Sequence, residues 1–148
     1  MAAAKEIRIG YAQGEEEIAA CFDLMRQLRP HLDSAADFAR RWHRQGESGY
    51  RLAVAWQDGL PVALAGFRVH ENLVHGRHLH VDDLVTDKAV RSAGHGRRLM
   101  DWLKAEAAKL ECGKLVLDAA LTNGLGHRFY FRQGFLAIAL RFSLPLPL

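Results

Sequence analysis

Apolar and polar residues alternate with a period of two along several short segments of the chain, as in strands that bury one face. This pattern, together with a short continuous apolar run near residue 115, predicts strands over residues 6–12, 50–56, 61–69, 77–86, 114–118 and 135–144. Asp58-Gly59 joins the second strand to the third, and this pair of residues is typical of a tight hairpin turn. Pro145 and Pro147 end the last strand, because proline cannot donate to a strand ladder.

Apolar residues spaced three and four apart predict amphipathic helices between these strands. The predicted helices cover residues 15–28, 94–110 and 123–133, and a fourth is capped by Asp33 or Ser34 and ends near Gly46. The order strand, helix, strand around residues 77–118 requires a crossover and therefore a parallel pair of strands. We expect an α/β fold in one domain over residues 1–148, with helices on both faces of a mixed sheet.

Composition narrows the class of protein. The chain has 148 residues, 49% hydrophobic and 25% charged, as in an ordinary soluble domain. Its apolar runs are shorter than the roughly 20 residues that cross a bilayer, and its N-terminus lacks the apolar core of a signal peptide. We therefore expect a cytoplasmic protein without a membrane partner. The net charge of +3 suits a polyanionic small molecule, and basic residues without interleaved aromatics argue against nucleic acid.

A glycine-rich turn lies between the strand 77–86 and the helix that follows it. It reads Arg91-Ser92-Ala93-Gly94-His95-Gly96, and Arg97 comes next. Backbone N–H groups at the start of a helix are unpaired and attract anions, and glycines let a phosphate approach closely. The sequence therefore predicts a site for a diphosphate at this turn.

The turn and a second motif together resemble the GCN5-related N-acetyltransferases (the GNAT family). The turn fits the family's Arg/Gln-x-x-Gly-x-Gly/Ala signature. The family's Asn-x-x-Ala-x-x-x-Tyr-x-x-x-Gly-Phe motif is matched by Asn123, Tyr130 and Gly134-Phe135, with Gly126 at the alanine position. The resemblance implies the family's fold, a mixed sheet of six to seven strands flanked by about four helices.

The resemblance also implies an activity: an enzyme that moves an acetyl group from acetyl-CoA to a primary amine. The transfer is expected to be direct, in a ternary complex and without a metal. The residues implied for acetyl-CoA are Leu84, Val85, Thr86, Arg91, Ser92, Ala93, Gly94, His95, Gly96, Arg97, Asn123 and Tyr130. Tyr130 is also the implied acid that protonates the departing thiolate. The acceptor site is implied in residues 24–46 and 71–76.

The segment Val81-Asp82-Asp83-Leu84-Val85-Thr86 resembles Leu-Glu-Asp-Phe-Phe-Val of diamine acetyltransferases. This resemblance implies Asp82 as the base, directly or through a water, and a small amine or polyamine-like acceptor. Strict alternation places Asp82 on a polar strand face and Asp83 among apolar residues, in a structural or amine-binding role. Asp118 is a second candidate base.

Other interpretations remain at this point. The acceptor is alternatively a peptide or protein amine, or the chain is a module that binds CoA without transferring anything. His78, His80 and Asp82 suggest a metal, but same-face strand positions lie about 7 Å apart, so we predict none. The apolar segment 135–148 is compatible with a homodimer formed through C-terminal strands, as in members of the family.

Overall fold

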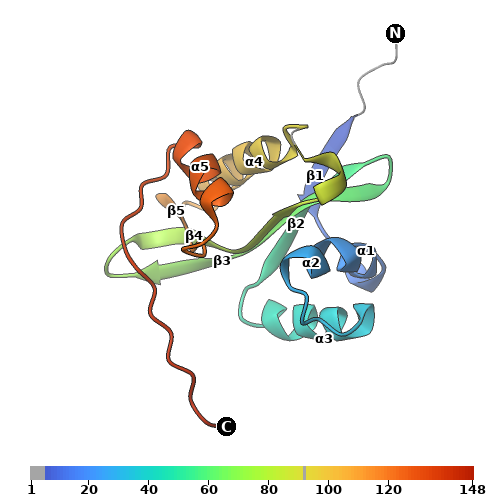
Figure 1. The fold of residues 1–148 in the computed structure, drawn as a ribbon, viewed down its shortest axis with the longest axis horizontal. Coiled ribbons are helices and arrows are strands. Elements are labelled where there is room, and N and C mark those ends of the chain that lie inside the picture. The colour runs from blue at the N-terminus through green and yellow to red at the C-terminus, as the bar shows by residue number, and fades with distance from the viewer. Residues whose placement is uncertain (1–5, 92) are drawn as a thin grey trace. The chain divides into compact units, whose positions relative to one another are not determined.

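The structure, a computed structural model, describes residues 6–91 and 93–148 (Figure 1). By its internal contacts the chain divides into two units, one through Leu117 and one from Asp118 to Leu148. Each unit is described by itself, and the expectation of a single domain stays a prediction.

The first unit is built on a five-stranded sheet whose spatial order is the order along the chain. The strands are β1 (Ile7–Tyr11), β2 (Arg51–Gln57), β3 (Leu60–Asn72), β4 (Gly76–Thr86) and β5 (Lys114–Leu117). The first four pair antiparallel, and β4 and β5 pair in parallel across the helix between them. The predicted mixed sheet and its crossover are confirmed, but five strands form among the described residues instead of six to seven.

Five α-helices and one short 3-10 helix are present in the described residues. They are α1 (Gly14–Ala20), α2 (Phe22–Leu28), α3 (Ala35–Gly46), η1 (Lys88–Val90), α4 (His95–Lys109) and α5 (Gly124–Arg132). The helix predicted over 15–28 is two helices, because the turn at Cys21 opens to φ −86° and ψ −5°. Ser34 is the cap of α3, and its Oγ accepts a hydrogen bond from the Asp37 amide at 3.0 Å.

The strand predicted over 135–144 does not form in the structure. After α5 the chain turns at Gly134, with φ +94°, and continues without regular structure to Leu148. A strand needs a neighbour for its ladder, and the second unit contains no other extended segment that pairs with this one. The segment keeps the apolar alternation that predicted it, and the homodimer that it suggested stays a prediction.

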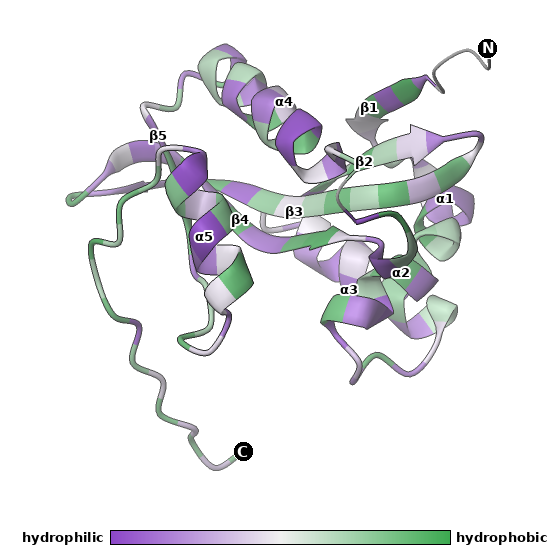
Figure 2. Cartoon of the chain, turned by 45° about the horizontal axis from the view of Figure 1, so that its top comes forward, coloured by the Kyte–Doolittle hydropathy of each residue, from purple (hydrophilic) through white to green (hydrophobic). Residues whose placement is uncertain are grey.

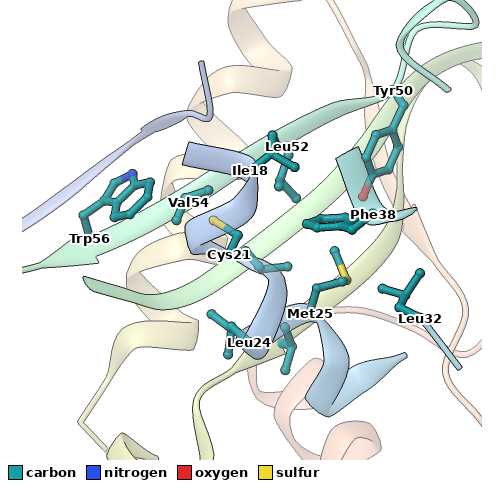
Figure 3. Close-up of a cluster of buried hydrophobic side chains, with 12 residues drawn as sticks. Ile18, Cys21, Leu24, Met25, Leu32, Phe38, Tyr50, Leu52, Val54 and Trp56 are labelled. Atoms are coloured by element: carbon teal, nitrogen blue, oxygen red, sulfur yellow. The ribbon is translucent and has the colours of Figure 1, made fainter. Parts of the chain in front are cut away.

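The helices α1–α3 and the helix α4 cover opposite faces of the first unit's sheet (Figure 1). The central strands β2 and β3 are mostly apolar along their length (Figure 2). Under α1–α3 lies a buried cluster (Figure 3) made of Ile18, Cys21, Leu24, Met25, Leu32, Phe38, Tyr50, Leu52, Val54, Trp56, Leu64 and Val85. Burial, with the charge of Glu17, raises the pKa of the Cys21 thiol to about 12, so this cysteine is an unreactive part of the core.

Candidate active site

The turn before α4 has the backbone geometry of an anion site. Gly94, the N-cap of α4, has φ +82° and provides no side-chain cap. The first helical hydrogen bond runs from the Arg98 amide to the Gly94 carbonyl at 3.1 Å. Among the described residues, no group accepts a hydrogen bond from the amides of His95, Gly96 and Arg97. Within the part of the chain that the structure describes, three N–H groups at the positive end of a 15-residue helix are therefore available to an anion.

The side chains around this turn divide into exposed cations and one buried ring. Arg91 and Arg97 are exposed, whereas His95 is only 3% exposed, and its Nδ1 lacks a hydrogen-bond partner among the described residues. Burial, assisted by the charge of Arg98, lowers the pKa of His95, so the ring is neutral at pH 7. The positive charge at this turn comes from arginines and the helix dipole. Ser92, also predicted here, lies outside the described residues.

The strand that leads into the turn has an open edge. β4 pairs with β5 only as far as Val81 opposite Leu117. Leu84, Val85 and Thr86 pair with β3 on one side and extend beyond the last β5 pair on the other. Within the first unit, this edge has no neighbouring strand, so it can take a linear chain that hydrogen-bonds as a strand does. The open edge and the amides of α4 together fit the diphosphate and the amide-containing arm of CoA.

An irregularity in β4 changes the predicted placement of its two aspartates. Gly66 pairs with Asp83 and Phe67 pairs with Val81, so Asp82 is an extra residue in the ladder. Such a bulge breaks the strict alternation of side chains. Asp82 and Asp83 consequently line one cavity, and the prediction that Asp83 lies on the opposite, apolar face is wrong.

Asp83 is held by hydrogen bonds at both carboxylate oxygens. Tyr50 Oη donates to Oδ2 at 2.7 Å, and Arg29 Nε donates to Oδ1 at 2.9 Å. Arg29 Nη2 also donates to the Asp82 carbonyl at 2.8 Å, which ties α2 to the bulge. Burial and the nearby Asp83 charge raise the pKa of Tyr50 well above its usual value, so the phenol stays a donor. Asp83 is therefore an acceptor whose position is fixed by one hydrogen bond at each carboxylate oxygen.

Gly66 makes room for this arrangement. The Tyr50 ring lies across β3 at this residue, and a Cβ added to Gly66 would be 2.7 Å from Tyr50 Cε2 and closer still to the hydroxyl. No side chain larger than hydrogen fits there without moving the phenol.

Asp82 is less constrained than Asp83. Its Oδ2 is shielded from solvent and has no hydrogen-bond partner among the described residues. The nearest cation is Arg68, whose Nη1 lies 3.6 Å away. Of the two neighbouring carboxylates, Asp82 is therefore the less tightly held, and its side chain is 31% exposed against 16% for Asp83.

The two aspartates lie at a cavity of about 310 Å³ between the helices α2 and α3 and the strands β3 and β4. This volume is at the small end of the range for small-molecule sites. Its lining consists of Met25, Arg29, His31, Leu32, Phe38, Arg41, Trp42, Gln45, Tyr50, Arg68, Asp82 and Asp83. The expected acceptor region 24–46 supplies eight of these residues, whereas 71–76 supplies none.

The second unit contains the other predicted site residues. Tyr130, on α5, contacts the rings of Phe129 and Phe135, and burial raises its pKa, which keeps the hydroxyl protonated at pH 7. Asn123 caps α5, and its Oδ1 accepts from the Gly126 amide at 3.0 Å. Asp118 forms an ion pair with Arg141 at 2.6 Å.

The side chain of Asn123 occupies the space that a Cβ at residue 126 would need. A Cβ on Gly126 would overlap the amide of Asn123, so glycine at the family's alanine position lets the cap fold over the helix start.

The histidines of the β3–β4 hairpin lie close together, with ring centroids of His70 and His78 5.9 Å apart and of His75 and His78 5.2 Å apart. Within the described ranges, no group of histidine, cysteine, aspartate and glutamate side chains is arranged to hold a metal ion. The same ranges contain no helix with the length and apolar character of a membrane span.

Comparison with known proteins supports what the geometry indicates. The model of the Acetyltransferase (GNAT) family matches residues 16–135. The "Uncharacterized N-acetyltransferase YhdJ" of Bacillus subtilis (strain 168) is 30% identical over 133 residues, which cover 89% of this chain and 94% of that one.

Solved structures show the same fold at low identity. Aminoglycoside N-acetyltransferase AAC(6')-Iy in complex with CoA superposes with a TM-score of 0.84 at 14% identity, over 99% of this chain and 98% of that one. Ribosomal-protein-alanine N-acetyltransferase from Brucella melitensis gives 0.78 at 21% identity, over 95% and 99%.

The chain belongs to the acetyltransferase (GNAT) family, and the predicted class of enzyme, an N-acetyltransferase, is confirmed. The two solved structures are named for very different acceptors, so the fold leaves the acceptor open.

Sequence reasoning missed the residues that organise the two aspartates. Tyr50 lies just before β2 and Arg68 lies on β3, whereas Asp82 and Asp83 lie on β4. The local sequence around Tyr50 and Arg68 does not indicate their contacts with the aspartates. One signal was present, because a glycine inside the apolar strand segment 61–69 indicates a bulge or a close approach, and Gly66 has both.

Proposed function

We propose that this enzyme transfers the acetyl group of acetyl-CoA to a small primary amine, by direct transfer within a ternary complex. One observation carries the proposal. Three amides at the start of α4 have no partner among the described residues, and they follow a strand whose edge is open within the first unit and which bears a carboxylate that lines a small cavity. Acetyl-CoA supplies an acetyl thioester, and the chain supplies binding, orientation and proton transfer.

The residues along β4 and α4 would hold the cosubstrate. The amides of His95, Gly96 and Arg97 donate to the diphosphate, and the guanidiniums of Arg91 and Arg97 add charge around it. The open edge at Leu84–Thr86 binds the pantetheine arm, and an amide N–H at Val85 or Thr86 donates to the thioester oxygen. A fixed donor there stabilises the negative charge that develops, by a few kcal/mol.

Two side chains move protons in this proposal. Asp82 accepts the proton that the amine must lose before it attacks, directly or through a water. In support, its Oδ2 accepts no hydrogen bond among the described residues, and its side chain lines the cavity. Tyr130 donates its hydroxyl proton to the thiolate that leaves. Its raised pKa keeps the hydroxyl protonated at neutral pH before this transfer. Asn123 completes the binding of the arm.

Release of the CoA thiol during incubation with acetyl-CoA and single amines tests the proposal. We expect turnover on a small primary amine, and Tyr130→Phe should lower kcat at least tenfold with nearly unchanged CoA affinity. Tyr11→Phe is the matched control, because Tyr11 donates to Glu106 on α4 and does not line the cavity. Equal rates for Tyr130→Phe and the parent enzyme would remove Tyr130 as the acid.

The base is tested separately by the pH dependence of the rate. Asp82→Asn should abolish the acidic limb of the profile, and Asp118→Asn should leave it in place. The reverse result would transfer the role of base to Asp118.

The size of the cavity distinguishes a small amine from the alternative acceptor, a peptide or protein amine. A volume of about 310 Å³ favours a small amine over a protein substrate. CoA binding measured by calorimetry, without thiol release on any amine or peptide, would instead define a CoA-binding module.

A further inference from the structure

The charges in the cavity beside β4 are not those that a polyamine requires. Three arginines line it, Arg29, Arg41 and Arg68, and two aspartates, Asp82 and Asp83, are its only carboxylates among the described residues. Arg29 is bound to Asp83, and Arg68 lies 3.6 Å from Asp82 and donates to Gln45 Oε1 at 2.8 Å. These two cations are thus matched by the two carboxylates.

Arg41 is the third arginine of the lining, and its partner is a carboxylate that does not line the cavity. Its Nε donates to Asp37 at 3.2 Å, so its two terminal nitrogens are left without a partner among the described residues. Asp37 also pairs with Arg40 at 3.5 Å, so one carboxylate is shared between two guanidiniums. The lining therefore has three guanidiniums against two carboxylates, and on the α3 side Arg41 contacts Asp37 through Nε alone.

We infer, on the basis of the proposed function, that the acceptor carries an anionic group, a carboxylate or phosphate, in addition to its primary amine. The ammonium group lies against Asp82 on β4, and the anionic group binds the terminal nitrogens of Arg41 on α3. A guanidinium with both terminal nitrogens available fits a carboxylate or a phosphate with two parallel hydrogen bonds. Phe38 and Tyr50, which lie in the cluster of Figure 3, supply apolar walls between the two ends.

A diamine fits the same cavity poorly. Its far ammonium would face Arg41, and like charges at close range repel. The inference thus narrows the class of small amines and disfavours the polyamine-like acceptor that the resemblance of Val81–Thr86 implied.

Three acceptors that differ only at the far end test this inference, namely 4-aminobutanoate, 1-aminobutane and 1,4-diaminobutane. Thiol release from acetyl-CoA gives kcat/KM for each, and 3-aminopropanoate and 6-aminohexanoate vary the length. We expect the best zwitterion to exceed the diamine at least tenfold. Arg41→Gln should lower kcat/KM for the zwitterion about ten- to hundredfold and change 1-aminobutane less than twofold.

Arg40→Gln is the matched control, because Arg40 lies on the same helix and contacts the same Asp37 but does not line the cavity. It should leave the order of acceptors unchanged. A diamine that is the best acceptor, or an Arg41→Gln variant that loses activity equally on all acceptors, would overturn the inference and leave the proposed function intact.

If no acceptor in the series is acetylated, calorimetry on the CoA-saturated enzyme measures binding of the same compounds. Tighter binding of a zwitterion than of 1-aminobutane would then support the inference although the transfer proposal fails. Equal binding of the two would overturn it.

Discussion

The contact between Gly66 and Tyr50 gives a prediction whose size follows from the structure. A methyl group at residue 66 would lie within 2.7 Å of Tyr50 Cε2 and nearer to Oη, so the Gly66→Ala variant must move the phenol. The moved phenol loses its 2.7 Å hydrogen bond to Asp83, which is only partly exposed.

Two costs add in this variant. Loss of a hydrogen bond to a charged group costs about 1.5–3 kcal/mol, and overpacking of a buried site costs about 1–3 kcal/mol. We therefore expect Gly66→Ala to lower the free energy of unfolding by about 2.5–6 kcal/mol, from the sum of these ranges. Tyr50→Phe removes only the hydroxyl and should lower it by about 1.5–3 kcal/mol.

Urea unfolding of the full chain measures both changes, and Gly10→Ala is the matched control. Gly10 also lies in a strand, its φ is not positive, and an added Cβ meets nothing within 4 Å, so that variant should be neutral or slightly stabilised. Gly66→Ala should also change function, because the displaced Tyr50 no longer holds Asp83 in the cavity lining. We expect a higher KM for the acceptor and an unchanged CoA affinity. Equal stability of Gly66→Ala and Gly10→Ala would refute this account of the two aspartates.

Three further outcomes are expected. Ser34→Ala should lower the free energy of unfolding by about 1 kcal/mol in urea titrations, because α3 loses its cap. Gly94→Ala places a Cβ at φ +82°, which costs about 1–2 kcal/mol and should weaken CoA binding in calorimetry, whereas Gly113→Ala should change neither. Because burial and Arg98 lower the pKa of His95, the unfolded chain binds more protons near pH 6, so stability falls as the pH drops through the ordinary histidine pKa of about 6.5. In His95→Gln, unfolding measured between pH 7.5 and 5 should depend less steeply on pH, and an unchanged slope would contradict the lowered pKa.

The sequence predicted those parts of the fold that local patterns determine. The strands of the first unit, the hairpin at Asp58-Gly59 and the parallel β4–β5 pair follow from periodicity and turn residues. The turn at residues 93–97 could be predicted because glycines and the start of an amphipathic helix are recognisable in the local sequence.

Predictions that depend on neighbours distant in sequence were less successful. The apolar alternation after residue 134 is real, but a strand also needs a partner, which no local pattern reveals. Strict alternation of side chains predicted opposite strand faces for Asp82 and Asp83, and one bulge next to Gly66 breaks that alternation. The ion pairs of Asp82 and Asp83 join residues more than ten positions apart, so the excess of arginines over carboxylates in the cavity lining is apparent only in the folded chain.

The central claim is that the main-chain amides at the start of α4 hold the diphosphate of CoA, and amide NMR of the ¹⁵N-labelled full chain during CoA addition tests it most directly. The account predicts large, saturable shifts of the His95, Gly96 and Arg97 amides, and no comparable shifts with pantetheine, which has no diphosphate. CoA that binds while these three amides stay unshifted would contradict the claim.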